Sequence, residues 1–263
     1  MHFNQIEDPM RFLNRLPLLI FFLNLMLYVP LSHGNELEDL VIVKYYESLG
    51  DQFFASREIP GNLEKGLKIY HKAISLKQDN PSINWKIARV NWFLGRESLE
   101  TKQKRIYFQQ GIKYGKRAIL ADGNNALAQL WYGLSLGSHA LEVGVMKALY
   151  QRDEIKDSLK KALELDRSQT RAILGLAGWY FSVPEVFGGS KETSFSMLDQ
   201  AIKMDPNFTA TYLLRGQYLM KIGKQTEAVG DFNKLLTIDN PTSSSGSVYD
   251  KAVARNLLAK LKS

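Results

Sequence analysis

The sequence contains no cysteine. This absence excludes disulfide bonds, thiolate zinc sites and cysteine nucleophiles. It also excludes membrane attachment through a lipid-modified cysteine, so that any anchor must be the N-terminal segment itself. Histidine is scarce as well: the chain has four, and only His71 and His139 follow residue 34. A metal site or a catalytic triad built on histidine therefore has few members to draw on.

Long apolar runs are also lacking, apart from one stretch near the N-terminus. It extends from Leu16 to Leu31, and Pro17, Asn24 and Pro30 interrupt it. Arginines precede the stretch and small residues follow it, which is the layout of a secretory signal peptide, and the run is shorter than a typical membrane-spanning helix. We predict a signal peptide over residues 1–34, with an uncleaved N-terminal anchor as the alternative. The mature chain would then be exported, periplasmic or associated with the cell envelope, and soluble if cleavage follows Gly34.

The charge balance is moderately basic, with 34 lysines and arginines against 27 acidic residues. A cluster of six basic residues stands out. It comprises Lys102, Lys104, Arg105, Lys113, Lys116 and Arg117. On a helix these residues do not form one stripe, and apolar residues between them supply a buried side. We therefore interpret the cluster as a solvated helix face and predict no nucleic-acid binding.

The clearest pattern is a repeat that spans residues 162–239. Small residues alternate with large ones at fixed helical spacing, and turns follow each helix. The second copy carries Ala201, Asp205-Pro206, Tyr212, Gly216, Ala228, Phe232 and Leu235. From Ala201 to the equivalent Leu235 is 34 positions, which is the period of the tetratricopeptide helix pair.

Earlier repeats are longer. An alanine near the end of each second helix recurs at Ala73, Ala118, Ala162 and Ala201, and Leu235 is the equivalent in the last copy, with gaps of 45, 44, 39 and 34. Such gaps imply insertions, which in a helical solenoid gather on one face, often the binding face. The two most unusual insertions cover residues 134–157 and 182–191.

The predicted fold class is therefore all-α. We expect an α-solenoid of antiparallel, tetratricopeptide-like helix pairs, with roughly five degenerate repeats, over residues 35–239. A polar linker is predicted at 240–247, and a C-terminal capping helix at 248–263, because the last segment is amphipathic.

The insertion at 182–191 predicts a sharp corner between two helices. Pro184 forbids continuation of a helix, Gly188 and Gly189 allow positive φ, and Ser190 can cap the next helix. Val186 and Phe187 are expected to form an apolar plug at this corner.

Candidate catalytic residues are few. Gly133-Leu134-Ser135-Leu136-Gly137 matches the nucleophile pattern of α/β-hydrolases, but that pattern requires a preceding strand, and here the sequence reads as a helix. His139 and Glu142 are three positions apart on a helix, and two ligands form a poor metal site. We predict that the protein is not an enzyme and uses no cofactor or metal.

Several motifs together resemble one known family. They are WYG at 131–133, LGLAGWY at 174–180, VPEVFGG at 183–189 and Ala201-Ile202, behind a signal-like N-terminus. This combination resembles the T-component family of tripartite ATP-independent periplasmic (TRAP) transporters, from about Asp51 to the C-terminus.

That resemblance implies a non-enzymatic accessory protein of a solute transport system. Its partners would be a periplasmic solute-binding protein and further copies of itself, with an apolar passage for a small organic ligand. A generic tetratricopeptide scaffold of the cell envelope and a small-molecule-binding groove protein are the alternatives. Candidate groove or interface residues are mainly aromatic. They are Trp131, Tyr132, His139, Glu142, Trp179, Tyr180, Phe187 and Tyr212.

Overall fold

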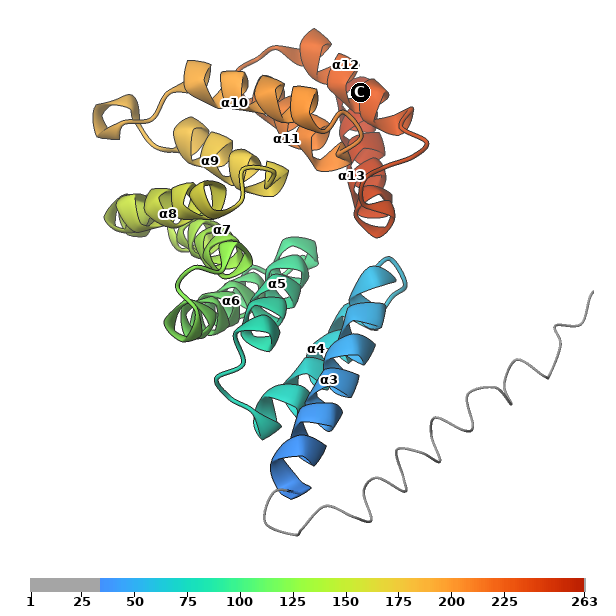
Figure 1. The fold of residues 1–263 in the computed structure, drawn as a ribbon. Coiled ribbons are helices and arrows are strands. Elements are labelled where there is room, and N and C mark those ends of the chain that lie inside the picture. Colours follow the sequence, from blue (N-terminus) through green and yellow to red (C-terminus); the bar gives the residue numbers. More distant parts are fainter. Residues whose placement is uncertain (1–33, 263) are drawn as a thin grey trace, which may run out of the picture.

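The computed structural model describes residues 34–262, and within this range it consists of helices and their connections, without strands. The helices form a curved stack (Figure 1). Their bounds are α3 (Gly34–Ala55), α4 (Asn62–Leu76), α5 (Pro81–Glu97), α6 (Thr101–Ala121), α7 (Ala126–Val143), α8 (Val145–Leu165), α9 (Thr170–Ser182), the 3₁₀ helix η1 (Glu185–Phe187), α10 (Lys191–Met204), α11 (Thr209–Lys221), α12 (Gln225–Leu236) and α13 (Ser244–Lys262). This architecture confirms the predicted all-α solenoid.

Consecutive helices pair along the chain, α3 with α4, α5 with α6, and so on to α11 with α12. In Figure 1 the first helices of the later pairs, α5, α7, α9 and α11, lie toward the inside of the arc, and α6, α8, α10 and α12 lie outside. The arc is nearly closed, because the start of α13 comes close to the C-terminal end of α3. The inner surface is therefore built from first helices.

The predicted repeat positions occupy equivalent places in the structure. Ala73, Ala118, Ala162, Ala201 and Leu235 are all completely buried. At each of the four alanines, the carbonyl accepts a hydrogen bond from the N–H of the residue that caps the helix four positions later. Each alanine thus sits at the last turn of the second helix of a pair, where a larger side chain would separate the helices.

The insertion at 134–157 turns out to be an extension of one helix pair. Helix α7 continues to Val143 and α8 starts at Val145, so the chain reverses at Gly144 alone. Gly144 has φ of 128°, which side chains other than glycine rarely adopt. The extra residues therefore lengthen two helices and do not form a separate loop.

The corner at 182–191 agrees with most of its prediction. Helix α9 ends at Ser182, Gly188 has φ of 91°, and Ser190 Oγ accepts the N–H of Thr193 at 3.1 Å. The expected apolar plug is wrong. Val186 is 85% exposed and Phe187 46% exposed, because the 3₁₀ turn directs both side chains outward.

The C-terminal helix differs from its prediction in where it begins. Helix α13 starts at Ser244, inside the segment predicted as a linker, and Ser245 and Ser247 are buried. The serine-rich sequence can be helical here because its hydroxyls find acceptors: Ser245 donates to the carbonyl of Ala55, and Ser247 to that of Ser244. The rest of α13 packs on α11 and α12 through Ala254 and Leu258, as expected of a cap.

The predicted signal peptide or anchor lies outside the described residues, except for Gly34. Within the described range, no helix combines the length and the apolar character needed to span a bilayer.

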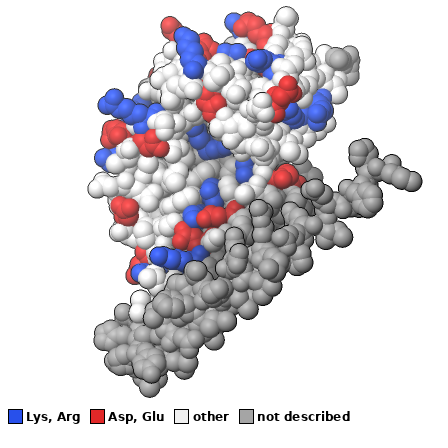
Figure 2. Space-filling model, turned by 45° about the vertical axis from the view of Figure 1, so that its right-hand side comes forward, with Lys and Arg blue, Asp and Glu red and all other residues white. Residues whose placement is uncertain are grey.

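Charged side chains of both signs are interspersed on the face shown in Figure 2. Most of the basic residues of α6 are exposed, in agreement with a solvated helix face. No large field of one sign is visible in this view.

Candidate functional site

The aromatic candidates on α7 belong to the core. Trp131 is 4% exposed and packs against Trp92, with ring centroids 5.7 Å apart. Tyr132 is 7% exposed, and its hydroxyl donates to Glu154 at the edge of α8. Burial raises the pKa of the Tyr132 hydroxyl, and the hydrogen bond to Glu154 and the charge of Glu154 raise it further. Both side chains therefore hold helices together and present no contact surface.

Only one of the later aromatic candidates reaches a cavity. Trp179 is buried, lines the cavity described below, and donates from Nε1 to the carbonyl of Arg152 at 2.6 Å. Tyr180 is half-buried beside it. Tyr212 is core, its hydroxyl donating to the carbonyl of Pro206 at 3.1 Å, and Phe187 lies on the outside.

His139 and Glu142 lie near the end of α7, where they are partly buried. The Nδ1 atom of His139 is buried without a hydrogen-bond partner. Burial lowers the pKa of His139, and the nearby Lys147 and Arg105 lower it further. Glu142 lies 3.7 Å from Lys104 Nζ. Among the described residues, no group of three or more potential ligands could hold a metal ion.

The hydrolase-like pattern has no hydrolase geometry. Gly133 to Gly137 is continuous helix within α7, and Ser135 is completely buried. The glycines instead permit close helix contacts, since a Cβ on Gly133 would lie 3.0 to 3.3 Å from Leu159 and Ser158 of α8.

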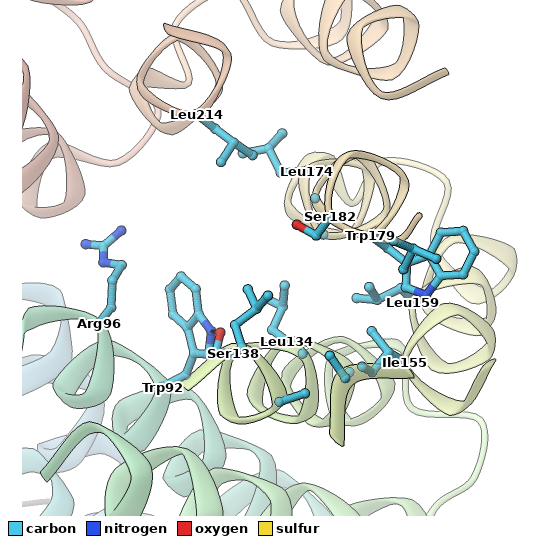
Figure 3. A pocket seen from close by; sticks show the side chains of 18 of the residues that line it. Trp92, Arg96, Leu134, Ser138, Ile155, Leu159, Leu174, Trp179, Ser182 and Leu214 are labelled. Atoms are coloured by element: carbon cyan, nitrogen blue, oxygen red, sulfur yellow. Dashed lines mark hydrogen bonds between the residues drawn. The ribbon is translucent and has the colours of Figure 1, made fainter. Parts of the chain in front are cut away.

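The inner surface contains an apolar cavity of about 400 Å³. Its walls come from α5, α7, α8, α9 and α11, with one residue from α13, and Figure 3 shows their side chains surrounding an open space. The apolar walls include Trp92, Leu134, Ile155, Leu159, Leu174, Trp179, Leu213 and Leu214. Glycines at 133, 137, 175 and 178 line it as well, and a Cβ at any of these positions would lie within 3.5 Å of a neighbouring side chain.

Three arginines line this apolar cavity. Arg96 of α5 and Arg171 of α9 lie together at one end, where both contact the rings of Trp92 and Phe93. The third, Arg152 of α8, lies 3.3 Å from Asp153. The Arg171 guanidinium lies over aromatic rings, 4.9 Å from the Phe208 centroid and 5.7 Å from that of Trp92. Within the described part of the chain, its guanidinium makes no hydrogen bond or ion pair. Arg171 therefore carries a positive charge that is supported by ring faces and lacks a paired acceptor.

More arginines surround this end of the cavity. The pKa of Arg171 is lowered to about 9, mainly by burial and also by the charges of Arg96, Arg57 and Arg89, against the opposing effect of Asp250. Burial likewise lowers the pKa of Arg57 to about 10, together with the charges of Arg89 and Arg96. Four neighbouring guanidinium groups that disfavour one another create a local excess of positive charge.

The nearby carboxylates are already engaged. Asp51 lies 3.4 Å from Arg89 and 2.6 Å from Lys86. Glu97 lies 3.3 Å from Arg96, and Asp250 lies 3.6 Å from it. The cavity thus combines apolar walls with a guanidinium end whose charge the protein neutralises only in part.

Sequence reasoning missed most of these residues. Arg171 looks like an ordinary basic residue in the first turn of a helix, and Arg96 like a basic residue in the last turn. The available signal was the recurrence of glycine in the first helices at 133, 137, 175 and 178, a pattern that helix packing also explains.

The fold now defines the class of protein. Solved structures similar to this chain include a tetratricopeptide repeat protein from Thermus thermophilus, with a TM-score of 0.62, 14% identity, and coverage of 81% of this chain and 99% of that one. PilF from Pseudomonas aeruginosa gives a TM-score of 0.52 at 14% identity, covering 85% and 93%. The chain is a helical-repeat protein of tetratricopeptide-like fold.

The family follows from the sequence comparisons. Residues 51–193, just over half of the chain, match the model of the family described as Regulator of microtubule dynamics protein 1-3, and the chain belongs to this family. It is 22% identical over 173 residues to the bovine Regulator of microtubule dynamics protein 1, a match that covers 59% of this chain and 55% of the relative. The rat Regulator of microtubule dynamics protein 3 is 23% identical to this chain over 118 residues, a match that covers 45% of this chain and 25% of the relative.

These comparisons support the tetratricopeptide-like part of the predicted resemblance, and they give a different family from the T-component one. The motifs at 131–133 and 174–180 lie within α7 and α9, and 183–189 forms the corner between α9 and α10. Spacing of this kind serves the packing of helix pairs, and it can recur in families that share only the repeat fold.

Proposed function

We propose that this chain is a non-enzymatic binding protein whose inner cavity takes an organic anion with an apolar body. The observation that carries the proposal is the unpaired guanidinium of Arg171 at the end of an apolar cavity. The apolar body would lie among the leucines of α7, α9 and α11, and the anionic group would lie against Arg171 and Arg96.

The size of the cavity supports this class of ligand. A volume of about 400 Å³ falls within the range of roughly 300 to 1,000 Å³ that is common for small-molecule sites. Burial of an apolar chain supplies affinity in proportion to the area removed from water, at about 25 cal/mol per Å². The guanidinium supplies selectivity, because an anion there gains a charge-assisted, bidentate contact.

The test compares two probes of equal chain length, dodecanoate and the uncharged dodecanol. We expect the wild-type chain, residues 35–263, to bind dodecanoate more tightly than dodecanol in isothermal titration calorimetry. Leu214→Trp should abolish binding of both, because Leu214 points into the cavity (Figure 3) and the larger ring would fill it. Leu120→Trp, at a position 79% exposed on α6, is the matched control and should bind like the wild type.

Failure of the wild-type chain to bind either probe, or equal binding by the Leu214→Trp variant, would refute this proposal. Equal affinity for the acid and the alcohol would refute the assigned role of the arginines.

Family membership favours a second candidate function, an interaction with microtubules. The relatives are named as regulators of microtubule dynamics, and this chain is basic overall, with a formal charge of +7. Because the match spans about half of the bovine relative, this role is a proposal for the present chain. The exposed lysines and arginines of α6 would supply the contact, through charge rather than shape.

Co-sedimentation with stabilised microtubules tests the second candidate. We expect binding that weakens with added salt, and that weakens further when Lys102, Lys113 and Lys116 are changed to glutamate. Changing Lys68, Lys72 and Lys77 of α4 and its cap in the same way is the control for total charge. Absence of pelleting at low salt would exclude the interaction.

The more specific predictions from the sequence remain open as proposals. A transport-accessory role with a periplasmic solute-binding protein has no support from the comparisons. Export stays a prediction that rests on residues 1–34, and mass spectrometry of the chain expressed with its own N-terminus would test it, because cleavage after Gly34 leaves Asn35 first.

A further inference from the structure

The beginning of α13 joins the two ends of the helical arc. Ser245 donates to the carbonyl of Ala55 at the end of α3, and Arg57 Nη2 donates to Ser243 Oγ at 2.5 Å. Tyr249 donates from its hydroxyl to the carbonyl of Arg96 at 3.3 Å. We call residues 243–250 the clasp. It links repeat units that are far apart in the sequence.

The clasp ends with a carboxylate in the cavity. Asp250 lines the cavity and is 2% exposed. Its Oδ2 atom accepts a hydrogen bond from Thr209 Oγ1 at 2.7 Å, at the start of α11. Its Oδ1 atom is buried without a hydrogen bond and lies 3.6 Å from Arg96 Nη1. Asp250 therefore faces the same guanidinium end as the proposed ligand anion.

This inference rests on the function proposed above. We propose that the Asp250 carboxylate competes with the ligand anion for Arg96 and Arg171. This carboxylate partly neutralises Arg96 and Arg171 in the ligand-free chain. An incoming anion takes over these guanidinium groups and releases the clasp from α3 and α5.

The geometry suits a contact that can be exchanged. At 3.6 Å, the approach of Asp250 to Arg96 is longer than the 2.7 to 2.9 Å of a strong charge-assisted hydrogen bond, so that a better-placed ligand anion can replace it. The cross-arc contacts of the clasp are three hydrogen bonds, the approach of Asp250 to Arg96, and the Arg96 guanidinium over the Tyr249 ring at 4.2 Å. The later part of α13 is held independently, with Ala254 completely buried and Leu258 9% exposed against α11 and α12. The clasp can therefore open while the cap remains attached.

Because the two events are linked, the competition can be measured both as a change in anion affinity and as a change in the stability of the clasp. If anion binding weakens the clasp, opening of the clasp must strengthen anion binding by the same factor. Removing the competing carboxylate is expected to strengthen anion binding as well. Asp250→Asn is the suitable change, since the amide oxygen can still accept the hydrogen bond of Thr209 while the charge is lost. We expect it to bind dodecanoate on the order of tenfold more tightly than the wild type, with dodecanol unchanged.

Hydrogen exchange provides the second measurement. In the wild type, saturation with dodecanoate should speed amide exchange in residues 243–250 and leave residues 254–261 unchanged. Ser243→Ala loosens the clasp without entering the cavity, and by the same linkage it should also tighten dodecanoate binding. Dodecanol serves as the matched probe that fills the cavity without an anion, and it should leave the exchange of the clasp unaltered.

The outcomes separate this inference from the proposed function. If dodecanoate binds the wild type and Asp250→Asn equally, or slows exchange in the clasp, the competition is wrong and the binding function stands. If neither chain binds dodecanoate, the binding function is wrong, and the competition with it. Binding of dodecanoate by Asp250→Asn alone would support the competition, because the carboxylate would then block the site in the wild type, and it would refute the binding function of the wild-type chain.

Discussion

Arg171 illustrates how a side chain proposed to bind a ligand can lower the stability of the fold. Arg171 is partly buried, and its guanidinium lies over the faces of Trp92, Phe93, Trp131 and Phe208 without a hydrogen-bond acceptor among the described residues. Burial of a cation without an acceptor costs free energy, and the lowered pKa of Arg171 is the expression of that cost. Retaining a charge in this position is most readily explained by a ligand.

The first prediction concerns this cost. Arg171→Met should leave the free energy of unfolding unchanged or raise it by about 1 kcal/mol at neutral pH, since methionine keeps the apolar contacts without the charge. It should also weaken dodecanoate binding on the order of tenfold and leave dodecanol binding unchanged. Chemical denaturation and calorimetry would measure both quantities.

The pH dependence of the same variant provides its control. The folded-state pKa of Arg171 is about 9, below its ordinary value of 12.5. As pH rises through about 9, the folded wild type loses the proton while the unfolded chain keeps it, so wild-type stability increases. Any stability advantage of Arg171→Met should therefore narrow between about pH 8 and pH 10. A constant difference would contradict burial of the charge.

A second prediction concerns the two histidines that the structure describes. Burial lowers the pKa of His71, with a further contribution from Lys113, and burial likewise lowers that of His139 from the ordinary value of 6.5. The unfolded chain therefore takes up protons first as pH falls, and stability is lost below about pH 6.5. Urea unfolding of His71→Gln/His139→Gln should show a flatter profile than the wild type between about pH 7 and pH 5.5. A profile parallel to the wild type would contradict the assignment.

Helix crossings are governed by glycine and alanine at fixed positions. Gly216 of α11 meets the completely buried Phe232 of α12, and a Cβ on Gly216 would lie closer than 3.0 Å to three ring carbons. Gly230 of α12 has nothing within 4 Å of the same added atom. Close helix packing therefore requires a glycine at position 216, whereas no neighbouring atom requires one at position 230.

The third prediction uses this pair. Gly216→Ala should destabilise the protein by about 1 to 3 kcal/mol, because overpacking outweighs the helix propensity of alanine. Gly230→Ala should stabilise it by about 0.5 to 1 kcal/mol, since only the propensity changes. Thermal unfolding followed by circular dichroism measures both, and a stabilising Gly216→Ala would show that the α11–α12 contact is looser than described.

Local signals predicted the elements well where the helix ends follow turn chemistry. The Asn80 and Asn125 side chains accept the N–H of the third residue on, at 3.1 and 3.0 Å, which is the ordinary N-cap arrangement. The start of α13 escaped prediction because serine and glycine favour turns in isolation. In this structure, the carbonyl of Ala55 at the end of α3 accepts a hydrogen bond from Ser245, and no local pattern encodes a partner so distant in sequence.

The arc as a whole depends on α13. Its buried residues share a core with Tyr212, Leu213 and Leu235, so its removal would expose an apolar face of the last helix pair. The fourth prediction is that a chain ending at Asp239 unfolds with a free energy lower by about 3 kcal/mol or more, at about 1.5 to 3 kcal/mol for each apolar side chain exposed. It should also bind an apolar dye such as anilinonaphthalene sulfonate more strongly. Truncation after Leu261 is the control and should behave like the full chain, and equal stability of both truncations would show that α13 is dispensable.

The sequence alone determined the class of fold, because a helix pair is specified by contacts between residues only a few positions apart. The period of small residues, the turns after each helix and the lack of cysteine were sufficient for an all-α repeat protein without thiol chemistry. The same local patterns could not separate core aromatics from those at a cavity, so Trp131 and Tyr132 proved to be core while Trp92 and Trp179 line the open space. Only the tertiary structure decided that Arg96, Arg171 and Asp250 meet. Their meeting depends on the curvature of the whole arc, which accumulates from many small crossing angles and leaves no mark at any single residue.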